Sequence, residues 1–157
     1  AAAAPPEPTT VRIAAVRDHD PFAEDRSEHP EEATRVLDSD PTTTWSTEQY
    51  STDRLNKEGV GLYLDAGARI PARRLDIRTP TPGFEIKVYG SNQAPFARPG
   101  PETFARWGSA LAEKKVDAKR SIAIDTGGRA LRYYLVWIVT LPPTGGKAEI
   151  GTLRLLR

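Results

Sequence analysis

The chain contains no cysteine and no methionine, and none of its apolar runs is long. Without cysteine there can be no disulfide, no thiolate metal site and no cysteine nucleophile. No apolar run approaches the roughly 20 residues that a membrane-spanning helix needs, and no signal peptide is visible. Because the sequence does not begin with methionine, we interpret it as a piece of a longer protein whose targeting signals lie elsewhere.

The chain also lacks a charge excess of either sign. Lys and Arg number 22 and Asp and Glu number 21, which argues against a nucleic-acid-binding module. The sequence patterns of common enzymes are missing as well: there is no G-x-S-x-G, no P-loop and no G-x-G-x-x-G. These absences predict a protein that binds or positions something and does not catalyse.

Proline and glycine are plentiful, with 14 and 12 residues, and they separate short apolar runs. Proline and glycine at this spacing favour many short strands joined by turns. We expect an Ala/Pro-rich linker over residues 1–10 and a single all-β domain over residues 11–157. About eight strands with intervening turns indicate a jelly-roll β-sandwich.

Several strands show the alternation of a sheet with one buried face. In Val60–Asp65 the residues Val60, Leu62 and Leu64 share one face. Leu131–Leu141 is the most apolar run and is apolar on both faces along Val136–Val139. The second run is therefore predicted to be a central strand covered on both sides. The segment 91–118 is interpreted as a loop with an irregular strand. The other predictions are strands at 11–16, 42–46, 73–79, 84–89, 121–125 and 149–156, and a helical turn at 31–37.

A family resemblance begins at Ala33–Ser46, which reads ATRVLDSDPTTTWS. It resembles the "A-x-x-x-x-D-G-D-x-x-T-x-W-x" motif of discoidin-type domains and family 32 carbohydrate-binding modules, with Ser39 in place of glycine. Downstream strands that resemble the same family are Gly59–Gly67, Arg73–Thr79, Tyr89–Ser91, Arg132–Ile138 and Glu149–Leu155. The resemblance implies a galactose-binding-like sandwich over nearly the whole chain after residue 10.

A narrower resemblance covers the segment 20–50. It looks like the C-terminal extracytoplasmic domain of bacterial membrane proteins, either kinase-like proteins or MviN/MurJ-type flippases. This implies a domain on the outer face of a bacterial membrane, tethered through the rest of the parent chain.

The family resemblance also implies a structural Ca²⁺ ion, because such domains hold one in the loop after the first strand. Hard cations need several oxygen ligands, and the candidates here are Asp38, Asp40, Thr43 and Glu149. The family's closing glutamate aligns with Thr152, so one carboxylate is lost. The alternative is that Asp38 and Asp40 only hydrogen-bond within the turn.

The loop from Arg17 to Glu32 is rich in carboxylates and contains both histidines of the chain, His19 and His29. Such residues can bind zinc or another transition metal. Their spacing matches no compact zinc motif, and a solvated loop is the alternative.

Aromatic rings stack on the faces of sugar rings, so loop aromatics are candidate ligand contacts. We name Tyr50 and Trp107, with Arg54 as a hydrogen-bonding partner, and Phe22 and Phe96 as further candidates. Trp45 and Trp137 are predicted to pack in the core. For each candidate, packing within the fold is the alternative.

Outward-facing basic residues form a last feature: Arg73, Arg74, Arg78, Lys114, Lys115, Lys119 and Arg120. They can meet anionic polymers or lipid headgroups, or they can only solubilise the surface.

Two functions remain open after these steps. The first is an extracytoplasmic module that recognises carbohydrate or cell-wall glycan through loops at one end of the sandwich. The second is a structural or protein-interaction module, with a non-functional sugar site, that positions or regulates an attached membrane protein. Fold alone does not choose between them.

Overall fold

The computed structural model describes residues 9–23, 27–38, 40, 42–51, 55, 57–95 and 99–157. These residues form ten strands and two short 3₁₀ helices, η1 and η2. In chain order the elements are β1 (Ala15–His19), η1 (Pro30–Leu37), β2 (Trp45–Ser46), β3 (Val60–Ile70), β4 (Arg74–Arg78), β5 (Glu85–Ser91), η2 (Pro101–Trp107), β6 (Ala112–Lys115), β7 (Lys119–Ala123), β8 (Leu131–Thr140), β9 (Glu149–Ile150) and β10 (Thr152–Leu156).

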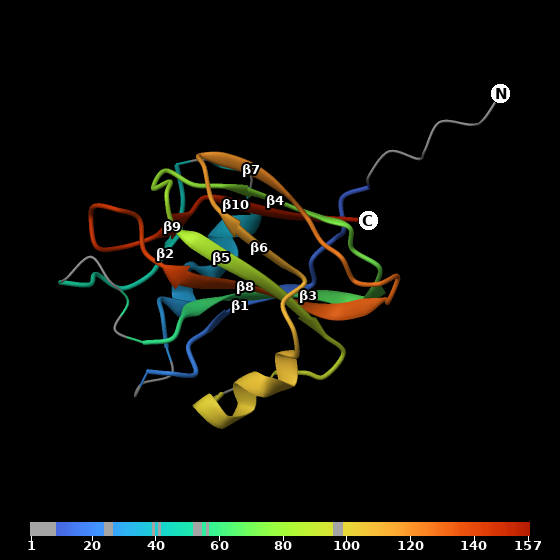
Figure 1. Cartoon of the computed structure of the whole chain (residues 1–157). Coiled ribbons are helices and arrows are strands. Elements are labelled where there is room, and N and C mark those ends of the chain that lie inside the picture. The colour runs from blue at the N-terminus through green and yellow to red at the C-terminus, as the bar shows by residue number, and fades with distance from the viewer. Residues whose placement is uncertain are drawn as a thin grey trace.

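Two antiparallel sheets lie face to face (Figure 1). The larger has the order β1-β3-β8-β5-β6, the smaller the order β10-β4-β7, and β2 pairs with β9 at one end. The main core lies between the sheets and takes side chains from both, such as Leu62 and Val136 from one and Ile77 and Leu155 from the other. The predicted all-β sandwich is therefore confirmed.

Strand β8 lies at the centre of the five-stranded sheet, between β3 and β5, as its apolar run predicts. Val136 and Ile138 point into the main core, whereas Leu135 and Trp137 belong to a second cluster on the outer face of the sheet. A strand with two covered faces reads as a continuous apolar run because neither face meets water.

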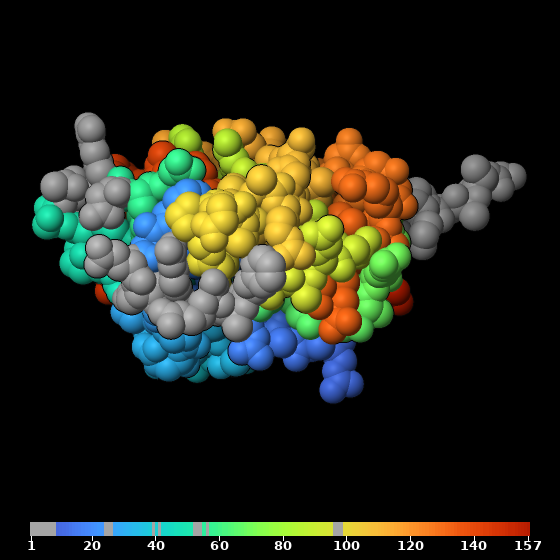
Figure 2. Space-filling view, turned by 90° about the horizontal axis from the view of Figure 1, so that it is seen from below, coloured from blue at the N-terminus to red at the C-terminus, as the bar shows by residue number. Residues whose placement is uncertain are grey.

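The second cluster is mostly aromatic and is covered by η2. Figure 2 looks onto this face and shows η2 lying across it. Gly59 allows Trp137 to pack closely, since a Cβ at residue 59 would lie 2.3 Å from the indole ring. The buried members of this outer aromatic cluster are Tyr63, Tyr89, Trp107, Tyr133, Leu135 and Trp137.

Some predicted elements are displaced. The first strand of the large sheet is Ala15–His19 and not Val11–Val16, because Val11 instead extends the small sheet by donating its N–H to the Leu155 carbonyl (2.8 Å). The predicted last strand is divided into β9 and β10 at Gly151. Within residues 91–118 the structure contains η2 and β6, so the prediction of an irregular strand there was incomplete.

The two ends of the sandwich differ in what they carry. At one end, Thr9 exchanges two backbone hydrogen bonds with Arg157 (2.9 and 3.0 Å), so the described sandwich includes part of the predicted linker. The opposite end, on the left of Figure 1, carries the loop after β1, the β2–β3 connection and the β8–β9 loop. None of the described helices has the length and apolar character to cross a membrane.

Candidate functional site

An open groove of about 380 Å³ lies at the loop end of the sandwich. Two segments form it: the loop that follows β1 and the connection from β2 to β3. It is lined by Phe22, Ala23, Glu48, Gln49, Tyr50, Ser51 and Lys57.

Phe22 is the half-buried aromatic residue of this groove. Its ring centroid lies 5.8 Å from that of Phe104 and 5.9 Å from that of Trp137. These contacts anchor Phe22 on the outer aromatic cluster while part of the ring still lines the groove. A fixed, partly exposed ring beside polar groups suits stacking on a sugar face.

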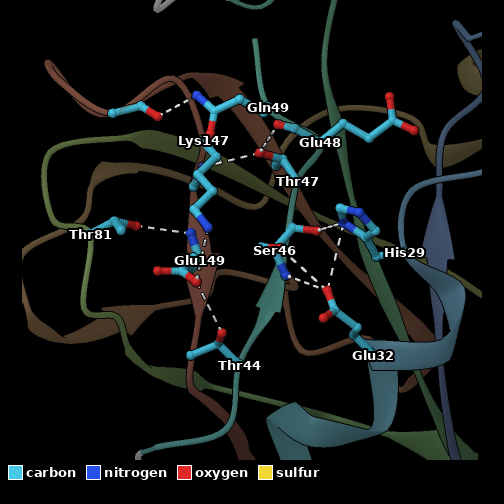
Figure 3. Close-up of polar contacts among 12 residues, drawn as sticks. His29, Glu32, Thr44, Ser46, Thr47, Glu48, Gln49, Thr81, Lys147 and Glu149 are labelled. Carbon is cyan, nitrogen blue, oxygen red and sulfur yellow. Dashed lines mark hydrogen bonds and ion pairs between the residues drawn. The ribbon is translucent and has the colours of Figure 1, made fainter.

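The polar wall comes from the segment after β2. Glu48, Gln49 and Ser51 are exposed. The Gln49 side-chain amide donates to the Gly145 carbonyl at 2.6 Å, a contact that appears in Figure 3. This bond fixes the side chain and leaves its amide oxygen without a partner among the residues that the structure describes. A held amide oxygen is a suitable acceptor for a sugar hydroxyl.

A buried charge cluster supports the groove from below. The Lys57 ammonium lies 2.9 Å from the nearer Asp20 carboxylate oxygen and 3.1 Å from Glu28 Oε2. Both carboxylate side chains are fully buried. Glu28 also accepts the Glu48 backbone N–H at 2.6 Å, and this bond ties the polar wall to the charge cluster.

Two buried carboxylates face one ammonium in this cluster, and burial together with this imbalance of charges shifts the pKa values of Asp20 and Lys57. The pKa of Asp20 is raised to about 7: burial is the main cause, the hydrogen bond with Glu28 and the charge of Glu28 add to it, and Lys57 opposes it. Burial lowers the pKa of Lys57, but hydrogen bonds to Tyr50 and Asp20 and the charges of Glu28 and Asp20 outweigh it, so that pKa is raised. A proton on Asp20 leaves a neutral Lys57–Glu28 pair.

The predicted contact Tyr50 lines the groove, but its ring is only 9% exposed. Its hydroxyl lies 3.2 Å from Glu28 Oε1, and the Lys57 ammonium lies 5.5 Å from the ring centroid. Burial raises the pKa of Tyr50 to about 12. Tyr50 therefore forms part of the wall, and the expected exposed ring is not found at this position.

Trp107 does not reach the groove of Tyr50. It ends η2, is 6% exposed, and donates its indole N–H to His19 Nε2 at 3.1 Å. The cavity beside these two residues measures about 20 Å³, which suits one water molecule and not a sugar ring. The prediction of an exposed sugar contact fails here because the sheet face needs a cover, and η2 supplies it. The third candidate, Arg54, lies outside the described residues, as does Phe96.

The predicted calcium ligands are already occupied by protein donors. Asp38 accepts the Thr43 hydroxyl at 2.5 Å and the Asp40 N–H at 3.0 Å, and Asp40 accepts both donors of Thr42. Glu149 instead accepts the Thr44 hydroxyl at 3.2 Å and lies 3.7 Å from the Lys147 ammonium (Figure 3). In the described part of the chain no three acidic or imidazole side chains are grouped as metal ligands. The residues thus fit a hydrogen-bonded turn better than a calcium cage, and the calcium site that the family resemblance implies is left to a direct binding test.

The two histidines of the acidic loop lie in different surroundings. His19 is buried beside Trp107. The His29 Nδ1 lies 2.6 Å from the Ser46 carbonyl and 3.6 Å from Glu32, and Figure 3 draws both contacts. The hydrogen bond to Ser46 raises the pKa of His29. The structure gives no support to a shared transition-metal site, although Glu24 and Asp25 of this loop lie outside the described residues.

A second open groove, of about 680 Å³, lies at the opposite end of the sandwich, where Thr9 meets Arg157. Its lining includes Arg73, Ile124 and Arg157 and, among the residues that the structure describes, no aromatic side chain. The loop-end groove is the better candidate for sugar recognition because it combines an aromatic ring with polar side chains.

Comparison with solved structures identifies the architecture. The family 32 carbohydrate-binding module of NanJ from C. perfringens, solved with galactose, matches 96% of this chain and 100% of its own, with a TM-score of 0.65 and 14% identity. The fold is that of a family 32 carbohydrate-binding module. The module of AlyQ, solved with 4,5-unsaturated mannuronic acid, matches 94% of this chain and 97% of its own, with a TM-score of 0.64 and 10% identity. Chitosan-binding module 1 from the chitosanase/glucanase of Paenibacillus sp. IK-5 matches 95% and 92%, with a TM-score of 0.58 and 14% identity.

This module fold also occurs inside longer proteins. The matched region makes up 34% of a truncated AlyQ that includes an alginate lyase domain, and 25% of a GH29 fucosidase from Ruminococcus gnavus. No protein-family model and no curated protein matches the chain. The resemblance to kinase-like and flippase domains is not supported by these matches.

Sequence reasoning named Phe22 only as a further candidate and missed Lys57. Lys57 lies in a loop whose composition gives no sign of burial, and its partners are 37 and 29 residues away in the chain. The only sequence signal was the excess of carboxylates in the loop after β1, which needs a counter-charge wherever it is buried.

Proposed function

We propose that this chain is a non-catalytic carbohydrate-binding module that holds a saccharide in the loop-end groove. The observation that carries the proposal is the half-buried Phe22, fixed on Trp137 and Phe104 and lining the groove with the polar side chains of the β2–β3 connection. Its fold relatives were solved with galactose and with unsaturated mannuronic acid, which supports a sugar as the ligand.

Each part of the groove has a role in this proposal. Phe22 stacks on the apolar face of a sugar ring, and Gln49 accepts a hydrogen bond from a hydroxyl group. The Lys57 cluster keeps the segment around Glu48 in place and takes part in no chemical step. The predicted extracytoplasmic location is part of the proposal, since glycans of the cell wall are found there.

The alternative of a protein-interaction module needs a contiguous exposed apolar patch. The outer aromatic cluster is an apolar group on an outer sheet face, but η2 lies across it. The observations therefore favour the sugar-binding function. Tethering of the parent protein to a membrane stays a prediction, which fractionation of cells that express the full-length parent will test.

Calorimetric titration with galactose, mannuronate oligomers and chitosan oligomers tests the proposal. We expect binding of at least one of these sugars, and Phe22→Ala should weaken it about two- to tenfold, the loss expected for one stacking ring. Tyr133→Ala is the matched control because Tyr133 belongs to the same outer aromatic cluster and packs on Tyr63 at 6.3 Å, but it is not stacked on Phe22 and does not line the groove. Equal weakening by both variants, or no binding of any of the three sugars, would contradict the proposal.

A further inference from the structure

The outer face of the small sheet carries a group of cations away from the loop-end groove. Arg74 and Arg78 on β4, Lys119 on β7 and Arg154 on β10 alternate with buried residues of their strands. Because alternate residues point to the same side of a sheet, all four side chains lie on the face turned away from the core.

The strand register places these cations close together. Arg78 lies opposite Lys119 on the neighbouring strand, and Arg154 lies opposite Asp76, one step along the sheet. Adjacent strands are about 4.8 Å apart and alternate residues along a strand about 7 Å apart, so the charges occupy neighbouring positions. Arg12 adds a fifth cation, since it lines a groove of about 400 Å³ beside β10 together with Arg154.

Few carboxylates balance this charge. Asp76 is the acidic residue on the face, and it is already bound by Arg74 at 3.1 Å and by the Ser121 hydroxyl at 2.6 Å. Among the residues that the structure describes, Arg12, Arg78, Lys119 and Arg154 have no carboxylate within 4 Å. The whole chain carries a net charge of only +1, so the positive charge is concentrated locally.

We propose that this face, defined by Arg12, Arg78, Lys119 and Arg154 and called here the basic face, binds a linear acidic polysaccharide. The groove beside β10 holds a stretch of the polymer, and the cations pair with carboxylates on successive sugar units. This site is separate from the loop-end groove, so its occupant and the saccharide of the groove bind independently.

The chemistry of the basic face favours a polysaccharide over other anionic partners. The other outward positions on these strands, Ser121, Ala123 and Thr152, carry small side chains. The groove beside β10 is also lined by the apolar residues Val11, Ile13, Val36, Leu37 and Leu153, which can pack on the apolar faces of sugar rings. A single-stranded nucleic acid needs aromatic rings for its bases, and among the described residues none lines this groove.

The test uses polygalacturonate as the probe and follows its binding to the whole chain at several salt concentrations. We expect affinity that falls as salt rises, because exposed charges are screened. Each cation should contribute roughly two- to fivefold, so the triple variant Arg78→Gln/Lys119→Gln/Arg154→Gln should weaken binding on the order of tenfold or more.

The matched control removes three exposed cations from the other sheet, with Arg17→Gln, Arg69→Gln and Lys115→Gln. It changes the net charge equally and should alter the affinity less than twofold. Equal losses in the two triple variants, no binding by the unaltered chain, or tighter binding to phosphatidylserine vesicles or single-stranded DNA than to polygalacturonate would each overturn the proposal. Calorimetric sugar binding at the loop-end groove should be the same in both triple variants.

Discussion

The indole N–H of Trp107 donates a hydrogen bond to Nε2 of His19 across 3.1 Å. An accepting Nε2 carries no proton, so the neutral ring holds its proton on Nδ1. That atom is buried and has no partner among the described residues. The adjoining cavity of about 20 Å³ can take one water molecule to accept this proton.

This environment predicts acid sensitivity. Burial lowers the pKa of His19 to about 4, whereas an unfolded histidine has a pKa near 6.5. The folded state therefore favours neutral His19, and this contribution to the free energy of unfolding is fully present above pH 6.5. As the pH falls toward 4, the contribution is lost, which lowers the free energy of unfolding by about 3 kcal/mol. His19→Gln keeps an acceptor for Trp107 and should remove this loss. Urea unfolding from pH 4 to 7.5 measures it.

His29→Gln is the control for that experiment, because the pKa of His29 is raised by its hydrogen bond to the Ser46 carbonyl. The contribution of His29 to the free energy of unfolding is present below the unfolded pKa and is lost as the pH rises. This pH dependence is opposite in sign to that of His19. If His19→Gln leaves the acid limb of the stability profile unchanged, the buried neutral imidazole is not its cause.

Asp20 should act in the reverse direction from its neighbour His19. Its pKa is raised by burial and by Glu28, so the folded state favours the protonated acid. The contribution of protonated Asp20 to the free energy of unfolding is fully present below the unfolded pKa near 4. It is lost as the pH rises through about 7. Asp20→Asn should therefore gain stability relative to the parent chain as the pH rises from 4 to 8. A difference between the two proteins that does not change with pH would refute this assignment.

Lys57 holds two fully buried carboxylates, so its removal should be costly. At pH 8, above the raised pKa of Asp20, Lys57→Met should lower the free energy of unfolding by about 3 to 5 kcal/mol, because both Asp20 and Glu28 then lack a counter-charge. Adding Asp20→Asn should restore part of the loss, since one buried charge is gone. Lys147→Met is the control: Lys147 is 42% exposed and lies 3.7 Å from Glu149, so its loss should stay below about 1 kcal/mol. Similar losses in the two methionine variants would rule out the charge cluster as a major contributor.

The loop of Asp38 and Asp40 should remain a hydrogen-bonded turn when calcium is added. We expect the same Tm in EDTA and in millimolar Ca²⁺, because Thr42, Thr43 and backbone donors already occupy these carboxylates. Differential scanning calorimetry measures this directly. Binding at 100 times the Kd would add about 2.7 kcal/mol and several degrees, so a rise of that size would establish the calcium site that the family resemblance implies.

The fold followed from periodicity, whereas most of the site did not. The strand β8 could be placed at the centre of a sheet because its apolar run leaves no face for water. Trp45 is fully buried, as its position in the resemblance to discoidin-type domains implies. The exposure of Trp107 could not be read in the same way, since it depends on η2 packing over a distant sheet face.

The charge cluster shows the same limit more clearly. Lys57 meets Asp20 and Glu28 only because the β2–β3 connection folds back over the loop after β1. No local pattern encodes such a contact, and a lysine in a polar loop is usually exposed. The carboxylates of the acidic loop were visible in the sequence, but which of them are buried depends on long-range packing.

The most direct test of the central claim is a sugar titration followed by two-dimensional ¹⁵N NMR of the backbone amides. The sugar is the one that the calorimetric panel selects. If the loop-end groove binds it, the amides of Ala23, Gln49 and Ser51 should shift in proportion to saturation, and those of Arg73 and Gly128 at the opposite end should not. Shifts confined to the opposite end, or shifts in neither groove, would contradict the account.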